Sequence, residues 1–291
     1  MRTIKSLINE EVISRASERA IVREENIEDV YYRYPELQKI DEELLALRGS
    51  RMLAVFDKNE EPIKAIEVRE EELKKAREAF ISKNGIDPLF DEEKAFCQEC
   101  DDTGYIEMAN GKNAVCRSCM KSQIEDCFNS SGLKDYSTYK IKNFDRSLFG
   151  NKKERSDKLK SMMKLFEEDL EGCPLKLYSD RGGSGKTFLA VVVTKYAILE
   201  GKNALYTKAE TFLDVNEDEK DDYKLCEMLI VDDYSAEITR KWQIASALNS
   251  ILEARMASNR PTVIISSSSK EQLVMESDER IAKKIERSNL I

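Results

Sequence analysis

Histidine is absent from this chain of 291 residues. That absence excludes catalysis by Ser-His or Cys-His pairs and removes histidine from the possible ligands of a metal ion. No apolar run approaches the roughly 18 residues that a membrane-spanning helix needs, and the N-terminus lacks the apolar segment of a secretory signal. The seven cysteines are therefore expected to be thiols or metal ligands and not disulfides. Together these absences predict a soluble, cytoplasmic protein with no membrane partner.

Negative charge is concentrated in the first half of the chain. The net charge is −9 overall, −6 over residues 1–95 and −3 over residues 96–135, which leaves residues 136–291 neutral. This balance argues against a protein that coats nucleic acid by bulk electrostatic attraction. The length allows about two domains. We expect the acidic front half to meet another protein, on a basic patch of that partner.

Residues 1–95 have the apolar spacing of helices. Ile4, Ile8 and Val12 recur every four residues with charged residues between them. The pattern is compatible with a small helical bundle and with an antiparallel helical arm that docks a partner. We assign this region to a helical N-terminal arm that binds a partner. Residues 128–145, rich in Ser, Asn and Gly, are predicted to form a linker.

Four cysteines occur as two Cys-x-x-Cys pairs separated by fifteen residues, with a short hairpin expected between them. This spacing is typical of a structural zinc site, in which each pair directs two sulfur atoms at one ion and no position stays open for catalysis. We predict a zinc module at residues 96–127, and the alternative is a set of incidental or redox cysteines. The predicted zinc ligands are Cys97, Cys100, Cys116 and Cys119. The other three, read as buried thiols, are Cys127, Cys173 and Cys226.

A phosphate-binding loop follows an apolar strand at residues 175–178 and opens an apolar helix. Backbone N–H groups at the helix start cradle phosphates, a lysine reaches the terminal phosphates, and a hydroxyl group lies on Mg²⁺. The sequence therefore predicts that ATP and Mg²⁺ bind here. The residues predicted to bind nucleotide are Gly182, Gly183, Ser184, Gly185, Lys186 and Thr187, with Thr187 also on Mg²⁺.

Asp180 departs from the usual form of such a loop, which has glycine five residues before Gly185. Aspartate tolerates unusual backbone angles better than most residues, so the turn is expected to survive. One negative charge ~6 Å from a phosphate charge, at an effective dielectric constant of ~20, costs about 2.8 kcal/mol before screening. Lys186, Mg²⁺ and the backbone N–H groups oppose that repulsion, and Arg181 is a candidate partner for the carboxylate. We predict that ATP binding is weakened and not abolished.

Carboxylates end a second apolar strand, at residues 228–233. In a phosphate-loop protein the first of them, Asp232, holds Mg²⁺ through water, and the second, Asp233, orients or deprotonates the attacking water. A serine-rich segment follows the strand at residues 261–265. Ser267 is our candidate for a polar group near the terminal phosphate, and the alternative is a simple serine-rich turn.

Strands and helices alternate after residue 146. This order predicts an α/β domain at residues 146–291, in which helices flank a parallel sheet. The strands are expected at 175–179, 203–207, 227–232 and 261–266, and the helices at 153–170, 186–200, 238–258 and 270–287.

Several runs of residues resemble DnaC/DnaI-type helicase loaders, and IstB-type transposition ATPases share the same AAA+ core. The runs are LIVDDYSAE (229–237), LEARM (252–256), RPTVIISS (260–267), SKEQL (269–273) and, upstream, RYPEL (33–37) and the Cys-x-x-Cys-Asp-Asp-Thr-Gly segment. The resemblance implies an AAA+ module that delivers a hexameric replicative DNA helicase onto single-stranded DNA during replication initiation. It implies further that the N-terminal region grips the helicase and that AAA+ domains self-assemble.

The resemblance also implies that one subunit completes its neighbour's site with an arginine. Arg280 matches the first arginine of the family motif, whereas Lys284 stands at the second, which is often taken as the one that acts. Lysine keeps the charge but lacks the planar fork that suits phosphate. Arg280 and Arg287 remain candidates, and each is also readable as a solvated charge on a helix.

Two further departures concern DNA and the end of the domain. The stretch at residues 214–222 is short and acidic, where relatives have a longer helical segment on a face that can meet DNA. Acidic residues repel phosphate, so direct contact with single-stranded DNA is doubtful. Relatives often continue with a further strand after the segment around Arg280, and this chain is expected to stop without one.

Three functions stay open. A helicase loader would bind the helicase through its N-terminal region and turn over ATP. A weakened AAA+ adaptor or inhibitor would use its domain for assembly with slow or no hydrolysis, and an IstB-like protein would serve transposition. Asp180, Lys284 and the acidic stretch favour the adaptor, whereas the zinc module and helical arm count against the IstB-like protein.

Overall fold

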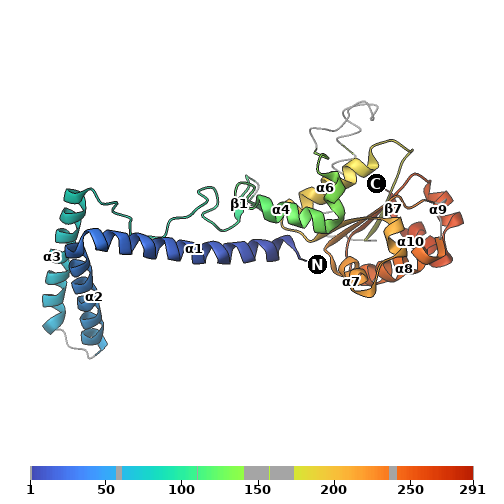
Figure 1. Cartoon of the computed structure of the whole chain (residues 1–291). Coiled ribbons are helices and arrows are strands. Elements are labelled where there is room, and N and C mark those ends of the chain that lie inside the picture. The colour runs from blue at the N-terminus through green and yellow to red at the C-terminus, as the bar shows by residue number, and fades with distance from the viewer. Residues whose placement is uncertain are drawn as a thin grey trace. The chain divides into compact units, whose positions relative to one another are not determined.

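A computed structural model describes residues 2–56, 61–109, 111–140, 157, 174–235 and 241–290 (Figure 1). The chain divides into two compact units, one of residues 11–102 and one of residues 1–10 with 103–291. Apart from residue 157, the predicted helix at 153–170 lies outside the described residues, as does Cys173. In the parts of the chain that are described, no helix is both long and apolar enough to cross a membrane.

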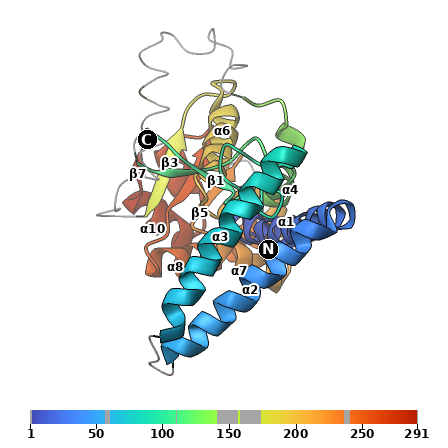
Figure 2. The same cartoon turned by 90° about the vertical axis from the view of Figure 1, so that its left-hand side faces the viewer.

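The unit of residues 11–102 is helical, as the apolar spacing predicts. Its helices are α1 (Ile4–Arg33, which begins in the other unit), α2 (Pro35–Phe56) and α3 (Glu61–Asn84). Pro35 opens α2, where its missing N–H costs no helical hydrogen bond. α2 and α3 pack side by side (Figures 1 and 2). Leu37, Ile81 and Phe90 form the buried centre of this unit.

Within the described residues, a five-stranded parallel sheet forms the centre of the other unit and confirms the predicted fold class. Its spatial order is β4-β5-β6-β3-β7. The strands are β3 (Leu175–Ser179), β4 (Ala204–Lys208), β5 (Met228–Asp232), β6 (Thr262–Ser266) and β7 (Asn289–Leu290). The first four agree with the prediction to within a residue. β7 corrects the expectation of no further strand, because its two residues pair with Lys176 and Leu177 of β3.

Both faces of the sheet are buried, which explains why its strands read as continuous apolar runs. Leu177, Leu229 and Ile264 belong to one cluster with residues of α8 and α10. The alternate residues Ile230 and Ile265 are equally buried, and successive side chains of a strand point to opposite faces. α6 packs against β4 and β5. The sheet is therefore the middle layer between helices.

The helices of this unit depart from the predicted ones at two places. They are α6 (Lys186–Leu199), α7 (Glu217–Leu225), α8 (Lys241–Ala257), α9 (Lys270–Glu276) and α10 (Glu279–Arg287). The single helix expected at 270–287 is two helices, because Asp278 leaves the helical conformation and accepts the N–H of Arg280 as the cap of α10. The acidic stretch forms α7, capped by reciprocal hydrogen bonds of Asn216 and Glu219.

The segment before the sheet is ordered by short elements. They are β1 (Tyr105–Glu107), β2 (Asn113–Val115), α4 (Lys121–Phe128), a π-helical turn (Asn129–Leu133) and a 3₁₀ turn (Lys134–Tyr136). β1 and β2 pair as the predicted hairpin. Within the segment predicted as a linker, Gly132 has φ +80°, and a Cβ atom there would lie 2.0 Å from the Tyr206 carbonyl oxygen. These turns therefore pack closely against β4, while residues 141–145 lie outside the described residues.

A buried arginine ties α8 to the strands beside it. Arg255 is fully buried and donates through Nε to Thr262 Oγ1 at 2.8 Å. Its other guanidinium nitrogens donate to the carbonyl oxygens of Tyr223, Cys226 and Pro261. These partners satisfy a buried charge with backbone acceptors, which fixes the start of β5 and β6 relative to the helix.

Candidate functional site

A cleft of about 650 Å³ lies at the carboxyl ends of β3, β5 and β6. The order of the parallel strands explains its position, since β6 separates β3 from β5 and their carboxyl ends share one edge. The cleft brings together three sequence motifs that lie far apart in the chain. Its lining residues are Thr138, Tyr139, Gly182 to Phe188, Asp232, Asp233, Ile265, Ser266 and Ser267.

The phosphate loop has the backbone form that an anion needs. Gly183 and Gly185 have φ values of +75° and +81°, which side chains rarely allow, and Gly185 caps the start of α6. Ser184 Oγ is buried and has no hydrogen-bond partner among the described residues. An unpaired buried hydroxyl group is costly, so it marks a place for a ligand. The loop therefore fits a phosphate group.

Lys186 lies at the base of this loop. Its side chain is nearly buried, and Nζ donates to the carbonyl oxygens of Asp180 and Arg181 at 2.7 and 2.8 Å. Thr187 follows it at the start of α6 and lines the same cleft. The predicted lysine and hydroxyl group are thus both next to the space that the loop encloses.

Asp180 turns toward its own loop. Its Oδ1 accepts the backbone N–H of Arg181 at 2.8 Å, and its backbone N–H donates to the Ser266 carbonyl oxygen at 3.3 Å. The residues that line the cleft do not include Asp180. The expected pairing with Arg181 therefore involves the backbone, and the carboxylate occupies an N–H group that a glycine would leave available.

Replacing Asp180 with glycine is expected to raise the affinity for Mg-ATP a few-fold. The change removes a negative charge near the loop and releases the Arg181 N–H. The expected gain is smaller than the roughly hundredfold equivalent of 2.8 kcal/mol, since the side chain does not line the cleft. Titration calorimetry on Asp180→Gly and Asp180→Asn separates the causes, because asparagine removes only the charge. Unchanged affinity in both variants would contradict the prediction.

Asp232 is held by two hydrogen bonds. It is almost fully buried at the end of β5, where Oδ1 accepts the N–H of Asp233 and Oδ2 accepts the hydroxyl group of Tyr206, both at 2.8 Å. Tyr206 hydrogen-bonds in turn with the hydroxyl group of Tyr136 at 3.2 Å. Burial, followed by these hydrogen bonds, raises the pKa of Tyr206, so the phenol stays neutral and donates to the carboxylate. Tyr206 therefore orients the predicted Mg²⁺ ligand.

Replacing Tyr206 with phenylalanine is expected to reduce the Mg²⁺-dependent part of ATP binding about tenfold. The variant removes one hydrogen bond to a buried carboxylate, which contributes about 1.5–3 kcal/mol. Binding is measured by titration with and without Mg²⁺. Tyr136→Phe is the matched control, because it leaves the bond to Asp232 in place. An equal loss in both variants would indicate a general packing role for the tyrosines and contradict an orienting one.

Asp233 has an unusual backbone conformation and a cationic partner. Its φ is +55°, and its Oδ2 lies 3.3 Å from Lys208 Nζ in an exposed ion pair. Tyr136 and Asp233 raise the pKa of Lys208. Strained residues of this kind concentrate at functional sites. Asp233 lines the cleft beside Asp232, and its role in orienting water stays a prediction.

Ser267 lines the same cleft as the phosphate loop and the two aspartates. The neighbouring Ser266 is buried, and its Oγ accepts the N–H of Ser268 at 3.0 Å, which fixes the turn after β6. The structure places Ser267 where it can face a ligand, and its role stays a prediction.

An aromatic wall on one side of the cleft was missed by the sequence analysis. Tyr139 stacks on Phe188 of α6 with ring centroids 5.1 Å apart, and Tyr136 packs edge-on against Tyr139 and Tyr206. Tyr139 lies in the segment predicted as a linker, so no motif marked it. Tyr206 could have been found from the sequence, because a tyrosine in an apolar, buried strand predicts a hydrogen-bond partner for its hydroxyl group.

The three cations proposed to act in trans do not line the cleft of their own chain. Arg280 is exposed at the start of α10. Lys284 Nζ donates to Asn249 Oδ1 at 2.5 Å and to Glu253 Oε1 at 3.3 Å, both on α8. Lys284 is therefore engaged within its own subunit. The roles of Arg280 and Arg287 stay predictions.

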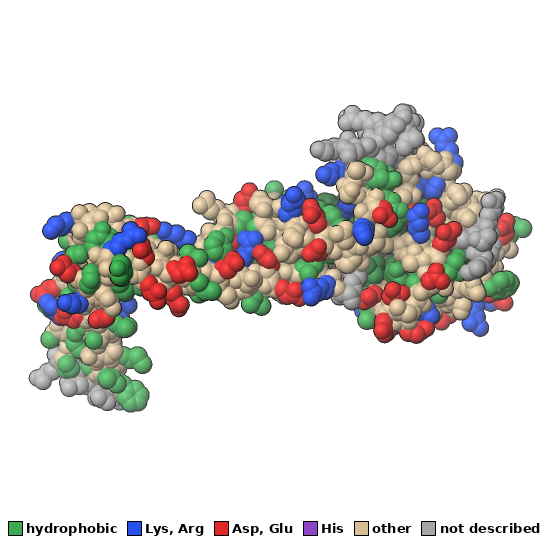
Figure 3. Space-filling view, in the orientation of Figure 1, with side chains coloured by type: hydrophobic (Ala, Val, Ile, Leu, Met, Phe, Trp, Pro, Cys, Tyr) green, Lys and Arg blue, Asp and Glu red, His purple; other side chains and the backbone are tan. Residues whose placement is uncertain are grey.

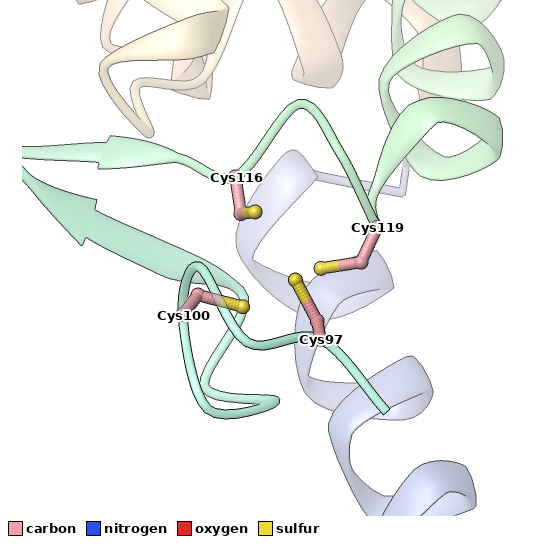
Figure 4. Close-up of side chains that lie close together, drawn as sticks. All are labelled: Cys97, Cys100, Cys116 and Cys119. Atoms are coloured by element: carbon pink, nitrogen blue, oxygen red, sulfur yellow. The ribbon is translucent and has the colours of Figure 1, made fainter. Parts of the chain in front are cut away.

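The predicted cysteine cluster is formed by four side chains that converge from two turns (Figure 4). The four sulfur atoms of Cys97, Cys100, Cys116 and Cys119 lie within 4.8 Å of one another, and the first three residues are buried. Four thiol groups at this spacing could hold a zinc ion with no open position. Cys127 and Cys226 lie outside the cluster and are buried, as expected.

Asp102 supports the first pair of cysteines and was not predicted. It is buried with φ +58°, and it accepts hydrogen bonds from the backbone N–H groups of Phe96 and Cys97. Its two oxygens also accept from Arg15 and Arg19 of α1. Burial alone would raise the pKa of Asp102, but these hydrogen bonds lower it. The carboxylate thus joins the turn before β1 to α1.

No protein-family model and no curated protein matches this sequence. The crystal structure of the DnaC helicase loader is 17% identical with a TM-score of 0.44, over 54% of this chain and 97% of that one. The crystal structure of DnaI is 21% identical with a TM-score of 0.40, over 52% of this chain and 85% of that one.

AMPPCP-bound DnaA from Aquifex aeolicus is 17% identical with a TM-score of 0.44, over 53% of this chain and 50% of that one. This chain therefore spans about half the length of that DnaA structure. At identities and TM-scores this low, the likenesses assign no activity, ligand or partner.

Proposed function

We propose that this chain is an AAA+ ATPase of the helicase-loader type. It binds a hexameric replicative helicase through residues 1–95 and uses ATP to help place that helicase on single-stranded DNA. The observation that carries the proposal is the cleft, in which the phosphate loop, Asp232, Asp233 and Ser267 line one space. The motifs that resemble helicase loaders supply the biological context.

Each group in the cleft has a defined task in this proposal. Bound Mg-ATP would supply a phosphoanhydride bond whose hydrolysis drives the cycle. The loop amides and Lys186 would hold the phosphates, and Thr187 and Asp232 would hold Mg²⁺. Asp233 would orient water, and Ser267 would lie near the terminal phosphate. The aromatic wall of Tyr139 and Phe188 offers an apolar surface beside the phosphate loop.

The end of α2 is the proposed contact for the helicase. Met52, Leu53, Val55 and Phe56 are all exposed there, Phe56 by 86%. Hydrophobic side chains gather visibly at this end of the α2–α3 pair (Figure 3). Exposed apolar clusters of this kind mark protein-interaction sites. An apolar contact at a helix end suits a groove on a protein partner.

Replacing Phe56 with glutamate is expected to weaken capture of a hexameric replicative helicase at least tenfold, because it places a charge in an apolar contact. The immobilised full chain is tested for retention of the purified helicase. Ile13→Glu, a similarly exposed apolar residue on α1, is the matched control. Failure of the native chain to retain any such helicase would contradict the loader proposal. Equal retention by both variants would show that the end of α2 is not the contact.

A weakened adaptor is the second candidate. Its support is local: Asp180 occupies a loop N–H group, and Lys284 is bound to α8 within its own subunit. Such a protein would bind the helicase and assemble, but helicase would not stimulate its ATP turnover. Turnover with and without helicase therefore separates the two functions.

A further inference from the structure

A second groove, of about 650 Å³, lies outside the nucleotide cleft and is rich in positive charge. It runs between α4, the turns after it and the carboxyl end of α6. Glu125 is the one acidic residue that lines it. The chain as a whole has a net charge of −9, whereas the charged residues that line this groove are mostly positive. Its five cationic lining residues are Arg117, Lys121, Lys134, Lys140 and Lys195.

Four of the groove's positive charges have no ion-pair partner among the described residues. Arg117, Lys121, Lys134 and Lys140 are exposed, and none forms an ion pair within the described part of the chain. Burial and the charge of Lys140 lower the pKa of Lys195. With five cationic residues and one acidic residue in its lining, the groove has an excess of positive charge, which attracts a polyanion.

The floor of the groove is apolar. Ile124, Phe128, Leu133 and Leu199 line it, and Lys195 Nζ lies 5.6 Å from the centre of the Phe128 ring. A free phosphate ion would contact the cations and leave the apolar floor without a contact. An acidic peptide would likewise bind through its carboxylates to the cations alone. A ligand with both anionic groups and flat apolar faces satisfies the whole surface. Single-stranded nucleic acid has this composition, since its phosphates bind cations and its bases stack on aromatic rings.

We propose that this groove binds single-stranded DNA through Arg117, Lys121, Lys134 and Lys140, with a base on Phe128. The site deepens the proposed loading function, on which it rests, and its lining includes no residue of acidic α7, where repulsion of phosphate is expected. Arg117 lies between Cys116 and Cys119, so the cysteine cluster positions one of the phosphate contacts. Lys195 also donates to the carbonyl oxygens of Tyr136 and Tyr139, which joins the groove to the aromatic wall of the cleft.

The test is fluorescence anisotropy of a labelled oligo(dT) with the full chain, loaded with zinc and free of nucleotide and helicase. The triple variant Lys121→Ala/Lys134→Ala/Lys140→Ala is expected to bind at least ~10-fold more weakly. The slope of log affinity against log salt concentration should fall by about 2, since each lost phosphate contact contributes about 0.7. The control Lys39→Ala/Lys74→Ala/Lys75→Ala makes the same change in net charge at exposed lysines of α2 and α3.

Phe128→Leu gives an independent readout of stacking. It should weaken binding roughly fivefold or more and leave the salt slope unchanged. The assay contains no nucleotide, so failure of the ATPase proposal does not affect this result. Native affinity and salt slope in the triple variant would overturn the site. Displacement of oligo(dT) by poly-glutamate at equal charge concentration would also overturn it and assign the groove to an acidic protein.

Discussion

Lys186→Ala is expected to lower the affinity for Mg-ATP at least ~100-fold and to abolish ATP turnover. The ammonium group is the one cationic group among the cleft-lining residues, and it lies beside the turns that Gly183 and Gly185 form. Two charge-assisted hydrogen bonds to phosphate contribute together about 3 kcal/mol or more, which corresponds to that factor.

The same lysine also closes its own loop, so its removal has a structural component. Nζ donates to two loop carbonyl oxygens, those of Asp180 and Arg181. The melting temperature without nucleotide reports this component, whereas the rise in melting temperature on adding Mg-ATP reports binding. Lys75→Ala, at an exposed lysine of α3, is the control. Native nucleotide-dependent stabilisation in Lys186→Ala would contradict the assignment of this loop as the nucleotide site.

Cys100→Ser is expected to remove bound zinc and to lower the melting temperature of the chain. The segment around the cluster has two strands of three residues each, β1 and β2, which bury little apolar surface. A metal ion therefore supplies free energy that such a segment lacks, and in comparable small zinc modules binding contributes ~10 kcal/mol or more. Serine cannot replace a thiolate ligand, so the site would become incomplete.

The zinc content per chain, measured after purification with zinc present, tests this prediction. Cys127→Ser is the matched control, because Cys127 is buried but lies outside the cluster, with Sγ 3.9 Å from Ser131 Oγ. That variant should lose some stability and keep one zinc ion. A full equivalent of zinc in Cys100→Ser, or none in the native chain, would favour the alternative of incidental or redox cysteines.

The sheet could be predicted because its strands are apolar runs that end in polar residues. Both faces are buried, so β5 needs no alternation, and Asp232 ends it because a carboxylate would be costly further inside. The break between α9 and α10 could have been predicted too. Ser277 and Asp278 precede Glu279 in the pattern of a helix start, but the apolar spacing through 270–287 concealed it.

The contacts around Asp232 could not be predicted, because they join three distant segments. Tyr206 reaches Asp232 across neighbouring strands, and Tyr136 and Tyr139 come from a segment whose composition indicates a linker. A motif can be recognised because its residues are close in sequence. These contacts join residues that meet only when the chain packs, so no spacing in the sequence indicates them. For the same reason the basic groove escaped notice: its cations are spread from Arg117 to Lys195 in a chain whose net charge is negative.

The central proposal is that this cleft hydrolyses ATP and that a bound replicative helicase stimulates the hydrolysis. The most direct measurement is the steady-state ATPase rate of the native chain, alone and with a hexameric replicative helicase, compared with Lys186→Ala. The account predicts turnover that rises when the helicase is present and that disappears in Lys186→Ala. A rate that helicase leaves unchanged, or that survives in Lys186→Ala, would contradict it.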